Sequence, residues 1–478
     1  MDYEAVIGLE VHLHLNTKTK AFCGCSTEFG REPNSCVCPV CLGFPGSLPV
    51  LNKLALDYAI KVALALNCRV QEYTKFDRKN YFYPDLPKNY QISQYDLPLS
   101  RDGFLDIYLE GRNKRIGIRR VHMEEDAGKL IHKEEVSLVD FNRSGIPLLE
   151  IVSEPHINSA EEAYEYLTAL KSIIEYLDVS DCDMEKGSLR CDANISVRKK
   201  GAAELGIKTE LKNMNSFKAV KEALAFEIER QSELLDAGED VVQETRLWDA
   251  KELKTLPMRT KEEAKDYRYF PEPDLAPFII KPEKIEEIRK VIPELPRQKM
   301  QRFIKDYGLS EYDARILVSS RKDADWAEEA IRTYPDKNKK PIVNWIIGPL
   351  ASLTGPNTTF SELKLPGGKE EFIKLVKATE EGKISHLMAK NVLSESINSG
   401  IPSLEIIQNR NLFQVSDLES LKGVVEDVLK ENPESVNDYK SGKANALMFL
   451  VGQAMKKSKG KANPKTLQEI LKRRLTDA

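Results

Sequence analysis

Four cysteines with short, paired spacings give the strongest chemical signal in this chain of 478 residues. Cys23 and Cys25 are one residue apart, Cys38 and Cys41 are two residues apart, and twelve residues separate the pairs. Zinc binds four thiolates in a tetrahedron, and each tight turn presents two of them. The spacing predicts a structural zinc site, and the alternative is a set of buried thiols without a metal. Cys36 is a fifth cysteine that such a site does not need.

A second group of residues follows the alternation of β-strands. Glu10 and His12 share one side of the first expected strand, and apolar residues occupy its other side. Later in the chain, Glu124 and Glu125 stand in an acidic run, and Glu150 stands inside an apolar strand. Carboxylates that gather in one place repel one another unless a cation compensates them. We predict a divalent-metal and phosphate site, with a half-exposed polar strand as the alternative. The carboxylates suit Mg²⁺, whereas His12 is a better ligand for Mn²⁺.

Two further stretches carry groups that suit a phosphorylated ligand. The expected strand 189–197 places Arg190, Asp192 and Asn194 opposite its apolar side. Residues 78–90 form a Pro-containing stretch that we expect to be a stiff loop, and 267–271 has a similar composition. In the first loop we expect cations to face phosphates and rings to stack on bases: Arg78, Lys79, Lys88, Tyr81, Tyr83 and Tyr90. The alternative is an ordinary loop packed by its aromatic side chains.

The end of the chain is basic. Residues 440–478 hold ten Lys or Arg and only two acids, while the rest of the chain is acidic. A cluster of lysines broken by Gly and Pro follows an expected amphipathic helix, and such a cluster suits a phosphate backbone. The residues that we expect to bind RNA there are Lys456, Lys457, Lys459, Lys461 and Asn463. The alternative is a charged terminus that only increases solubility.

The elements that must position these residues indicate an α+β fold followed by helices. Strands outnumber helices in the first part of the chain and are not separated by regular crossover helices. The expected strands are 6–15, 119–123, 147–152, 189–197 and 208–212, and helices begin near Ser159 and Phe217. Helices are expected at 297–308, 311–334, 341–353, 369–381 and 383–400. We predict three domains: 1–293 with a zinc-binding insertion at 23–41, a helical domain at 294–410, and a basic helical tail at 411–478.

Composition excludes several classes of protein. Hydrophobic residues are 41% of the chain and charged residues 31%, as in globular proteins, and the net charge of −4 excludes a uniformly basic coat. No apolar run is long enough to span a membrane, and the first residues lack the pattern of a signal peptide. Clustered cysteines without an export signal favour a metal in the cytoplasm. The chain also has no P-loop motif and no nucleophile elbow.

Several motifs together resemble one known family, the B subunits of bacterial aspartyl/glutamyl-tRNA amidotransferases. They occur in the family's order over nearly the whole chain, so the resemblance is specific. They are GLEVHLHL, FCGCSTEFG with VCPVCLGFPGSLPVLN, RKNYFYPDLPKNYQISQ, MEEDAGK, VDFNRSGIPLLEIVSEP, GSLRCDANISV, ELKNMNSFKAV, DYRYFPEPDL and GKANPK. Cys36 lies outside the family's cysteine pattern.

The resemblance implies an ATP-dependent ligase. Such proteins use ATP to phosphorylate the side-chain carboxylate of Glu mischarged on glutamine tRNA, or of Asp mischarged on asparagine tRNA. Ammonia from an amidase partner subunit then displaces the phosphate, and a small third subunit completes a heterotrimer. The resemblance also implies a first domain similar to the glutamine synthetase fold, with a mainly antiparallel sheet, and a tail that contacts the tRNA elbow.

The resemblance also assigns roles to residues. His12 and Glu125 are implied as the primary Mg²⁺ ligands, with Glu10, Glu124 and Glu150 completing the site. We expect the ammonia route to be lined or gated by Lys79, Lys88, Arg190, Asp192 and Asn194. A different class of function, a zinc-stabilised tRNA-binding module without catalysis of its own, remains the alternative. Inward-facing carboxylates argue against it, because an RNA-binding surface avoids negative charge.

Overall fold

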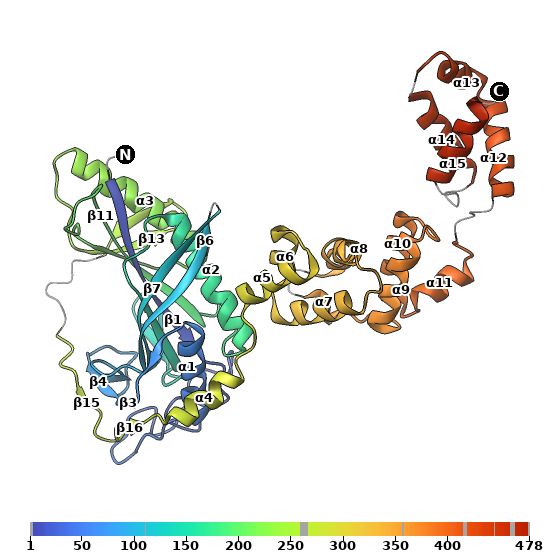
Figure 1. Ribbon diagram of the computed structural model, residues 1–478. Helices are drawn as coiled ribbons and strands as arrows, with labels where there is room; N and C mark the ends of the chain where they lie inside the picture. The colour runs from blue at the N-terminus through green and yellow to red at the C-terminus, as the bar shows by residue number, and fades with distance from the viewer. Residues whose placement is uncertain are drawn as a thin grey trace. The chain divides into compact units, whose positions relative to one another are not determined.

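The computed structural model describes residues 3–109, 111–258, 266–355, 358–413, 418–443, 445–458 and 464–476. The chain forms two compact units, Met1–Leu295 and Pro296–Ala478. The first unit mixes strands and helices, and the described elements of the second are all helical (Figure 1). The predicted α+β fold with a helical C-terminal region is confirmed. The finer division into domains at 1–293, 294–410 and 411–478 stays a prediction.

One large sheet, here called the central sheet, organises the first unit. Its neighbouring strands are antiparallel except for the parallel pair β12–β13. Across the described residues its order is β14 (Lys254–Pro257), β13 (Thr245–Asp249), β12 (Thr209–Lys212), β11 (Leu189–Lys199), β1 (Tyr3–His14), β10 (Pro147–Ser153), β7 (Arg112–Glu125), β6 (Ser100–Leu109) and β2 (Arg69–Val70). Strand β1 therefore lies in the interior of the sheet, hydrogen-bonded to β10 on one side and β11 on the other.

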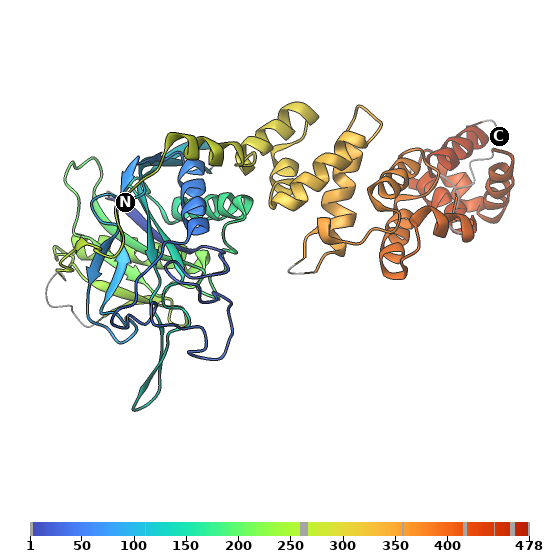
Figure 2. The same ribbon diagram turned by 90° about the horizontal axis from the view of Figure 1, so that it is seen from below.

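Helices cover one face of the central sheet. Alternate residues of β1, including Ile7, Leu9 and Val11, are buried in a core shared with apolar residues of these helices. Both views show α1 and α2 side by side against the sheet (Figure 1 and Figure 2). Among the described residues of this unit the helices are α1 (Lys53–Ala65), α2 (Ala160–Leu177), α3 (Phe217–Asp236) and α4 (Pro282–Lys290). The opposite face of β1 carries its polar residues, and the candidate functional site lies on that face.

Small sheets complete the first unit. In the part of the chain that the structure describes, they are β15 (Phe270–Pro271) with β4 (Asp77–Asn80) and β5 (Tyr90–Ser93), β16 (Phe278–Ile279) with β3 (Tyr73–Thr74), and β8 (Lys129–His132) with β9 (Ser137–Asp140). The prediction that 78–90 is wholly a loop was wrong at its two ends. Asn80 pairs with Tyr90, so a hairpin rather than a free loop holds this segment.

The second unit begins at α5 (Pro296–Tyr307). It continues with α6 (Glu311–Leu317), α7 (Arg321–Thr333), α8 (Lys340–Trp345), α9 (Gly368–Glu380), α10 (His386–Ser399), α11 (Ser403–Asn409), α12 (Leu418–Glu431), α13 (Pro433–Lys440), α14 (Asn445–Lys457) and α15 (Pro464–Thr476). The expected helix 311–334 is divided, because the hydroxyl of Ser320 caps a new helix by accepting the amide of Asp323. Helices α12, α14 and α15 share a separate apolar core. Among the described residues, no helix is both long and apolar enough to cross a lipid bilayer.

Candidate functional site

The register of three central strands assembles the site. His12 of β1 lies opposite Glu150 of β10, and Glu150 lies opposite His122 of β7. Because paired residues of adjacent strands point to the same face of a sheet, these three side chains form one row. Glu124 lies two residues beyond His122 and so points to the same face. Backbone hydrogen bonds alone therefore bring residues far apart in sequence to one place.

His12, Glu124 and Glu150 form a cluster that could hold a metal ion. One ligand atom from each lies within 4.8 Å of the others. His12 Nε2 is 3.6 Å from Glu150 Oε2, and His122 Nε2 is 3.5 Å from the same oxygen and 3.6 Å from Glu124 Oε1. Two carboxylates and two imidazoles thus face one another on the polar side of the sheet.

The electrostatics of this cluster favour a cation. Both carboxylate oxygens of Glu124 are buried without a hydrogen-bond partner, and so is Nδ1 of His122. Burial raises the pKa of Glu150, but the neighbouring His122 and the hydrogen bonds from both histidines outweigh burial and hold that pKa well below its usual value. A buried carboxylate without a donor is costly unless a cation compensates it. Oxygen ligands with an imidazole fit Mg²⁺ or Mn²⁺.

His122 was not among the predicted site residues. Burial lowers its pKa, but the carboxylates of Glu150 and Glu124 outweigh burial and raise the pKa to about 9. The signal was present in the sequence, because His122 and Glu124 are separated by one residue in a segment with strand character.

Glu125, which was expected to join His12 in one metal site, is not part of this group of side chains. Its carboxylate pairs with Lys88 and accepts the backbone amide of Ile92 at 2.9 Å. Both members of the ion pair are buried. Consecutive residues of a strand point to opposite faces, so Glu124 and Glu125 cannot both face His12 while β7 stays regular.

Other predicted residues lie on the polar face around the cluster, each with a partner. Asn194 Nδ2 donates to Glu10 Oε1 at 3.1 Å, and burial together with the charge of Glu150 raises the pKa of Glu10. Arg190 and Asp192 likewise have partners of opposite charge. Those partners are Asp126, 2.9 Å from the Arg190 guanidinium, and Lys212, which binds Asp192. Asp126 and Lys212 were not predicted.

Lys79, in the 78–90 segment, is under the influence of the carboxylates of the cluster, and its ammonium lies 5.2 Å from the ring centre of Tyr267. Burial lowers its pKa, but the charges of Glu124, Tyr269 and Glu150 outweigh burial and raise the pKa above its usual value. Arg78, by contrast, is held by Glu272 through bonds of 2.7 and 2.8 Å. Of the predicted phosphate-facing cations, Lys79 therefore has a pKa raised by Glu124 and Glu150, while Lys88 pairs with Glu125.

The four predicted zinc ligands come together. The sulfur atoms of Cys23, Cys25, Cys38 and Cys41 lie within 4.8 Å of one another. Within the described residues, Cys36 is buried but is not part of this group. The donor set is the one that a structural zinc ion requires.

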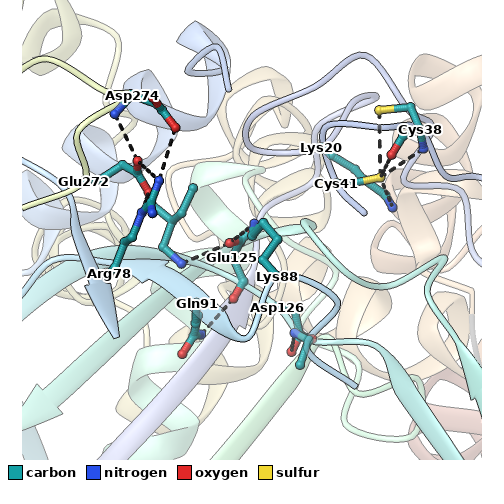
Figure 3. A network of polar contacts seen from close by, with 12 residues as sticks. Lys20, Cys38, Cys41, Arg78, Lys88, Gln91, Glu125, Asp126, Glu272 and Asp274 are labelled. Atoms are coloured by element: carbon teal, nitrogen blue, oxygen red, sulfur yellow. Dashed lines mark hydrogen bonds and ion pairs between the residues drawn. The ribbon is translucent and has the colours of Figure 1, made fainter. Parts of the chain in front are cut away.

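A buried lysine supports a charged state of these thiols. Lys20 has no solvent exposure, and its ammonium lies 3.6 Å from Cys41 Sγ and 3.2 Å from the carbonyl oxygen of Phe141 (Figure 3). A hydrogen bond from Cys23 lowers the pKa of Cys41 to about 4, and Lys20 contributes to that shift. Four thiolates with Zn²⁺ carry a net negative charge, so a buried ammonium beside them is compensated.

A cavity lies between the cysteine group and the Lys88–Glu125 ion pair. It has a volume of about 280 Å³, and Lys20, Cys41, Lys88 and Glu125 are among its lining residues. Gly145, with φ at +87°, closes one side, where a Cβ would stand 3.3 Å from Lys20 and 3.5 Å from Cys41. Figure 3 shows Cys38 and Cys41 with Lys20 on one side and the Lys88–Glu125 ion pair on the other.

The predicted RNA-binding lysines are only partly described. Lys456 and Lys457 end helix α14, and Lys457 pairs with Asp427 at 3.2 Å and with Glu431. Lys459, Lys461 and Asn463 lie outside the described residues.

Comparison with known proteins gives full-length matches. Residues 5–286 match the family described as "GatB/GatE catalytic domain", and residues 325–475 match the family described as "GatB domain". A protein of Carboxydothermus hydrogenoformans, named as the B subunit of an aspartyl/glutamyl-tRNA(Asn/Gln) amidotransferase, is 56% identical over 99% of each chain. Proteins of the same name are 54% identical in Thermoanaerobacter sp. (strain X514), over 100% of each chain, and 53% identical in Persephonella marina, over 98% of this chain and 99% of that one.

Proposed function

The chain belongs to the family of aspartyl/glutamyl-tRNA amidotransferase B subunits, and from this premise we propose that it carries the carboxylate-activating site of the enzyme. In this proposal, ATP phosphorylates the side-chain carboxylate of Glu on mischarged glutamine tRNA, or of Asp on mischarged asparagine tRNA. Ammonia then attacks the acyl carbon, and phosphate leaves with the bond electrons. The products are the amide, ADP and phosphate.

The observation that carries the proposal is the cluster of His12, Glu124 and Glu150, in which both buried carboxylate oxygens of Glu124 lack a hydrogen bond. These three residues would hold Mg²⁺, or Mn²⁺ in its place, with Glu10 close by. When bound, the ion would neutralise negative charge on the phosphoryl group being transferred. An RNA-binding module without catalysis has no need of such an acidic cluster.

The remaining polar residues of this face have roles that follow from their contacts. Lys79 supplies a positive charge next to the carboxylates and would bind a phosphate oxygen. Asn194 orients Glu10 through its hydrogen bond, and Asp126 fixes Arg190. These contacts hold the cations and carboxylates in place before a ligand arrives, which reduces the cost of ordering them during the reaction.

We further propose that the chain acts in a heterotrimer with an amidase subunit and a small third subunit. Ammonia is mostly protonated in neutral water, so it must reach the acyl carbon by a sheltered route. Lys79, Arg190, Asp192 and Asn194 lie on the polar face, whereas Lys88 lies at the cavity beside Glu125. A route that uses all five residues would therefore have to include the cavity at Lys88 as well as the polar face.

The central sheet, the cysteine group and the basic tail have structural or RNA-binding roles in this proposal. The long, mainly antiparallel sheet with one polar face supports a cradle similar to the glutamine synthetase fold. The cysteine group would bind zinc as a structural element. The basic segment with Lys456, Lys457, Lys459, Lys461 and Asn463 would contact the tRNA backbone.

One experiment tests the activation step. The chain is incubated with ATP, Mg²⁺, mischarged tRNA and ammonium chloride, with and without partner subunits, and amide formation is measured. We expect amide from ammonium, and amide from glutamine only when the amidase partner is present. Glu124→Gln is expected to abolish both, with tRNA affinity largely kept. Full ATP-dependent turnover by Glu124→Gln would reject the proposed site.

A further inference from the structure

The turn that follows Cys41 packs directly against Lys88. A Cβ atom on Gly43 would stand 2.4 Å from Cγ of Lys88 and 3.2 Å from both its Cα and its Cβ. These atoms belong to the backbone and to the first part of the side chain, so they could move aside only if the chain itself moved. Gly43 also has a φ of +70°, a conformation that glycine adopts without strain. The turn therefore leaves no room between Gly43 and Lys88 for a larger residue.

The cysteines determine where Gly43 lies. The amide of Cys38 donates to Cys41 Sγ at 3.2 Å, and the amide of Leu42 donates to the carbonyl of Cys38 at 3.0 Å. The amide of Gly43 donates to the carbonyl of Val40 at 3.1 Å. A zinc ion bound by Cys38 and Cys41 would hold two points of this turn, because both sulfur atoms would be its ligands. The position of Gly43 therefore follows from the metal site.

Lys88 forms its ion pair from a turn rather than from a strand. It lies between β4 and β5, and its side chain is only 8% exposed where it pairs with Glu125. The carboxylate of Glu125 is held separately, because it accepts the amide of Ile92 in β5 at 2.9 Å. A buried ion pair loses its compensation when one partner moves away. The pair therefore depends on what keeps Lys88 in place.

A second close contact joins the cysteine group to Glu125. A Cβ atom on Gly145 would stand 3.5 Å from Cβ of Cys41 and 3.8 Å from Glu125 Oε2. The carbonyl of Gly145 accepts the amide of Ala21 at 2.8 Å, and its amide donates to the carbonyl of Asp126 at 2.9 Å. Both members of the ion pair thus adjoin the cysteine group, and both line the same cavity as Cys41.

We propose that zinc binding at the four cysteines positions Lys88 for its ion pair with Glu125, through the turn that contains Gly43. The inference rests on the zinc site of the proposed function and gives that site a role beyond its own loop. Coupling between two sites is reciprocal, so correct placement of Lys88 must also favour zinc binding. A zinc ion with a purely local role would leave Lys88 unchanged when it is removed.

Amine labelling measures the placement of Lys88 without reference to activity. The full-length protein is treated with an acetyl ester of N-hydroxysuccinimide, with zinc bound and after its removal by a chelator, and mass spectrometry gives the labelling rate of Lys88. Lys75, which pairs with Asp77 in the same unit, reports general unfolding. Gly43→Ala adds the Cβ that meets Lys88. Gly46→Ala is the matched control, because Gly46 has a similar φ of +80° and a Cβ there would meet nothing within 4 Å.

We expect zinc removal to raise the labelling rate of Lys88 by about tenfold or more, while that of Lys75 changes by less than about twofold. In the zinc-loaded protein, Gly43→Ala is expected to raise labelling of Lys88, and Gly46→Ala is expected to leave it unchanged. A Lys88 that stays protected without zinc overturns the inference. Equal labelling of Lys88 in the two glycine variants, or an equal rise at Lys75, also overturns it.

Zinc affinity, measured by competition with a chromogenic chelator, gives the reciprocal test. Gly43→Ala is expected to weaken zinc binding by about 10- to 100-fold. Adding Lys88→Ala removes the Cγ that the new Cβ meets, so it should recover at least about fivefold of that loss. Additive effects of the two substitutions would contradict the inference. If the wild type binds no zinc, the proposed zinc site fails, and labelling of the two glycine variants still decides whether the turn positions Lys88.

Discussion

Glu124 and Glu125 are adjacent in strand β7, yet their carboxylates lie on opposite faces of the central sheet. Glu124 faces His122 and Glu150, and Glu125 pairs with Lys88. Two neighbouring glutamates therefore lie in different environments, one beside histidines and one beside a lysine.

Glu124→Gln is expected to weaken Mn²⁺ binding at least about tenfold, because it removes a ligand charge from the cluster, while Glu125→Gln changes it by less than about twofold. Glu125→Gln leaves Lys88 buried without its anion, so it is expected to destabilise the fold by about 3 kcal/mol. Electron paramagnetic resonance of Mn²⁺ and thermal unfolding measure the two effects. Glu134→Gln, in the turn between β8 and β9, is the exposed control. Equal loss of Mn²⁺ in both variants would place Glu125 in the metal site.

Lys20→Met is expected to weaken zinc binding by about 10- to 100-fold, since residues that contact metal ligands commonly contribute this much to affinity. The reason is the loss of the buried ammonium next to Cys41. Competition with a chromogenic chelator measures zinc release without reference to activity. Lys18→Met changes an exposed lysine two residues away and should release zinc as the wild type does. Identical release from the Lys20 variant would mean that its charge does not support the metal.

Glu227 makes the first unit sensitive to acid. Burial raises its pKa, but bonds from Arg230 and Thr255 outweigh burial and hold the pKa below the ordinary value of 4.5. Because the folded pKa is depressed, its stabilisation is present above about pH 4.5 and is lost as the pH falls below that value.

Glu227→Gln is therefore expected to lower the free energy of unfolding by about 2–3 kcal/mol at pH 7. The difference from wild type should shrink as the pH falls below about 4.5. Urea unfolding between pH 3.5 and 7 measures it, with the exposed Glu229→Gln as control. A difference that stays constant with pH would show that the carboxylate charge is not the cause.

Deleting 412–478 is expected to weaken tRNA binding and to flatten its dependence on salt, because each lost phosphate contact lowers the slope by about 0.9. Lys456→Ala should have a larger effect than Lys457→Ala, since Asp427 and Glu431 already pair with Lys457. Filter binding at several salt concentrations gives the slopes. A slope unchanged by the deletion would remove the basic tail from the RNA interface.

The sequence predicted the parts of the fold that depend on local pattern. Alternation placed β1, β10 and β11 correctly, and the spacing of Cys23, Cys25, Cys38 and Cys41 was enough to group them. It did not reveal pairing between distant segments. The contact of Asn80 with Tyr267 and the ion pair of Lys88 with Glu125 depend on how separate strands and loops meet. The pattern of apolar and polar residues within one segment does not predict such contacts.

The expectation that Glu125 joins His12 came from the family resemblance and not from strand alternation. The motif MEEDAGK places Glu124 and Glu125 next to each other in the sequence. The two-residue period of a strand would have separated them and paired Glu124 with His122 instead. Family resemblance indicated the right segment, and strand geometry decides which of its side chains faces the ligand.

The position of β1 in the interior of the central sheet has a consequence for how the protein matures. A register shift of one residue between β1 and β10 or β11 would place Glu10 and His12 in the apolar core. It would also expose the leucines of β1 to water. Mispaired chains should thus be rejected during folding itself, before any cofactor is available. The polar face and the correct register of the central sheet therefore form together.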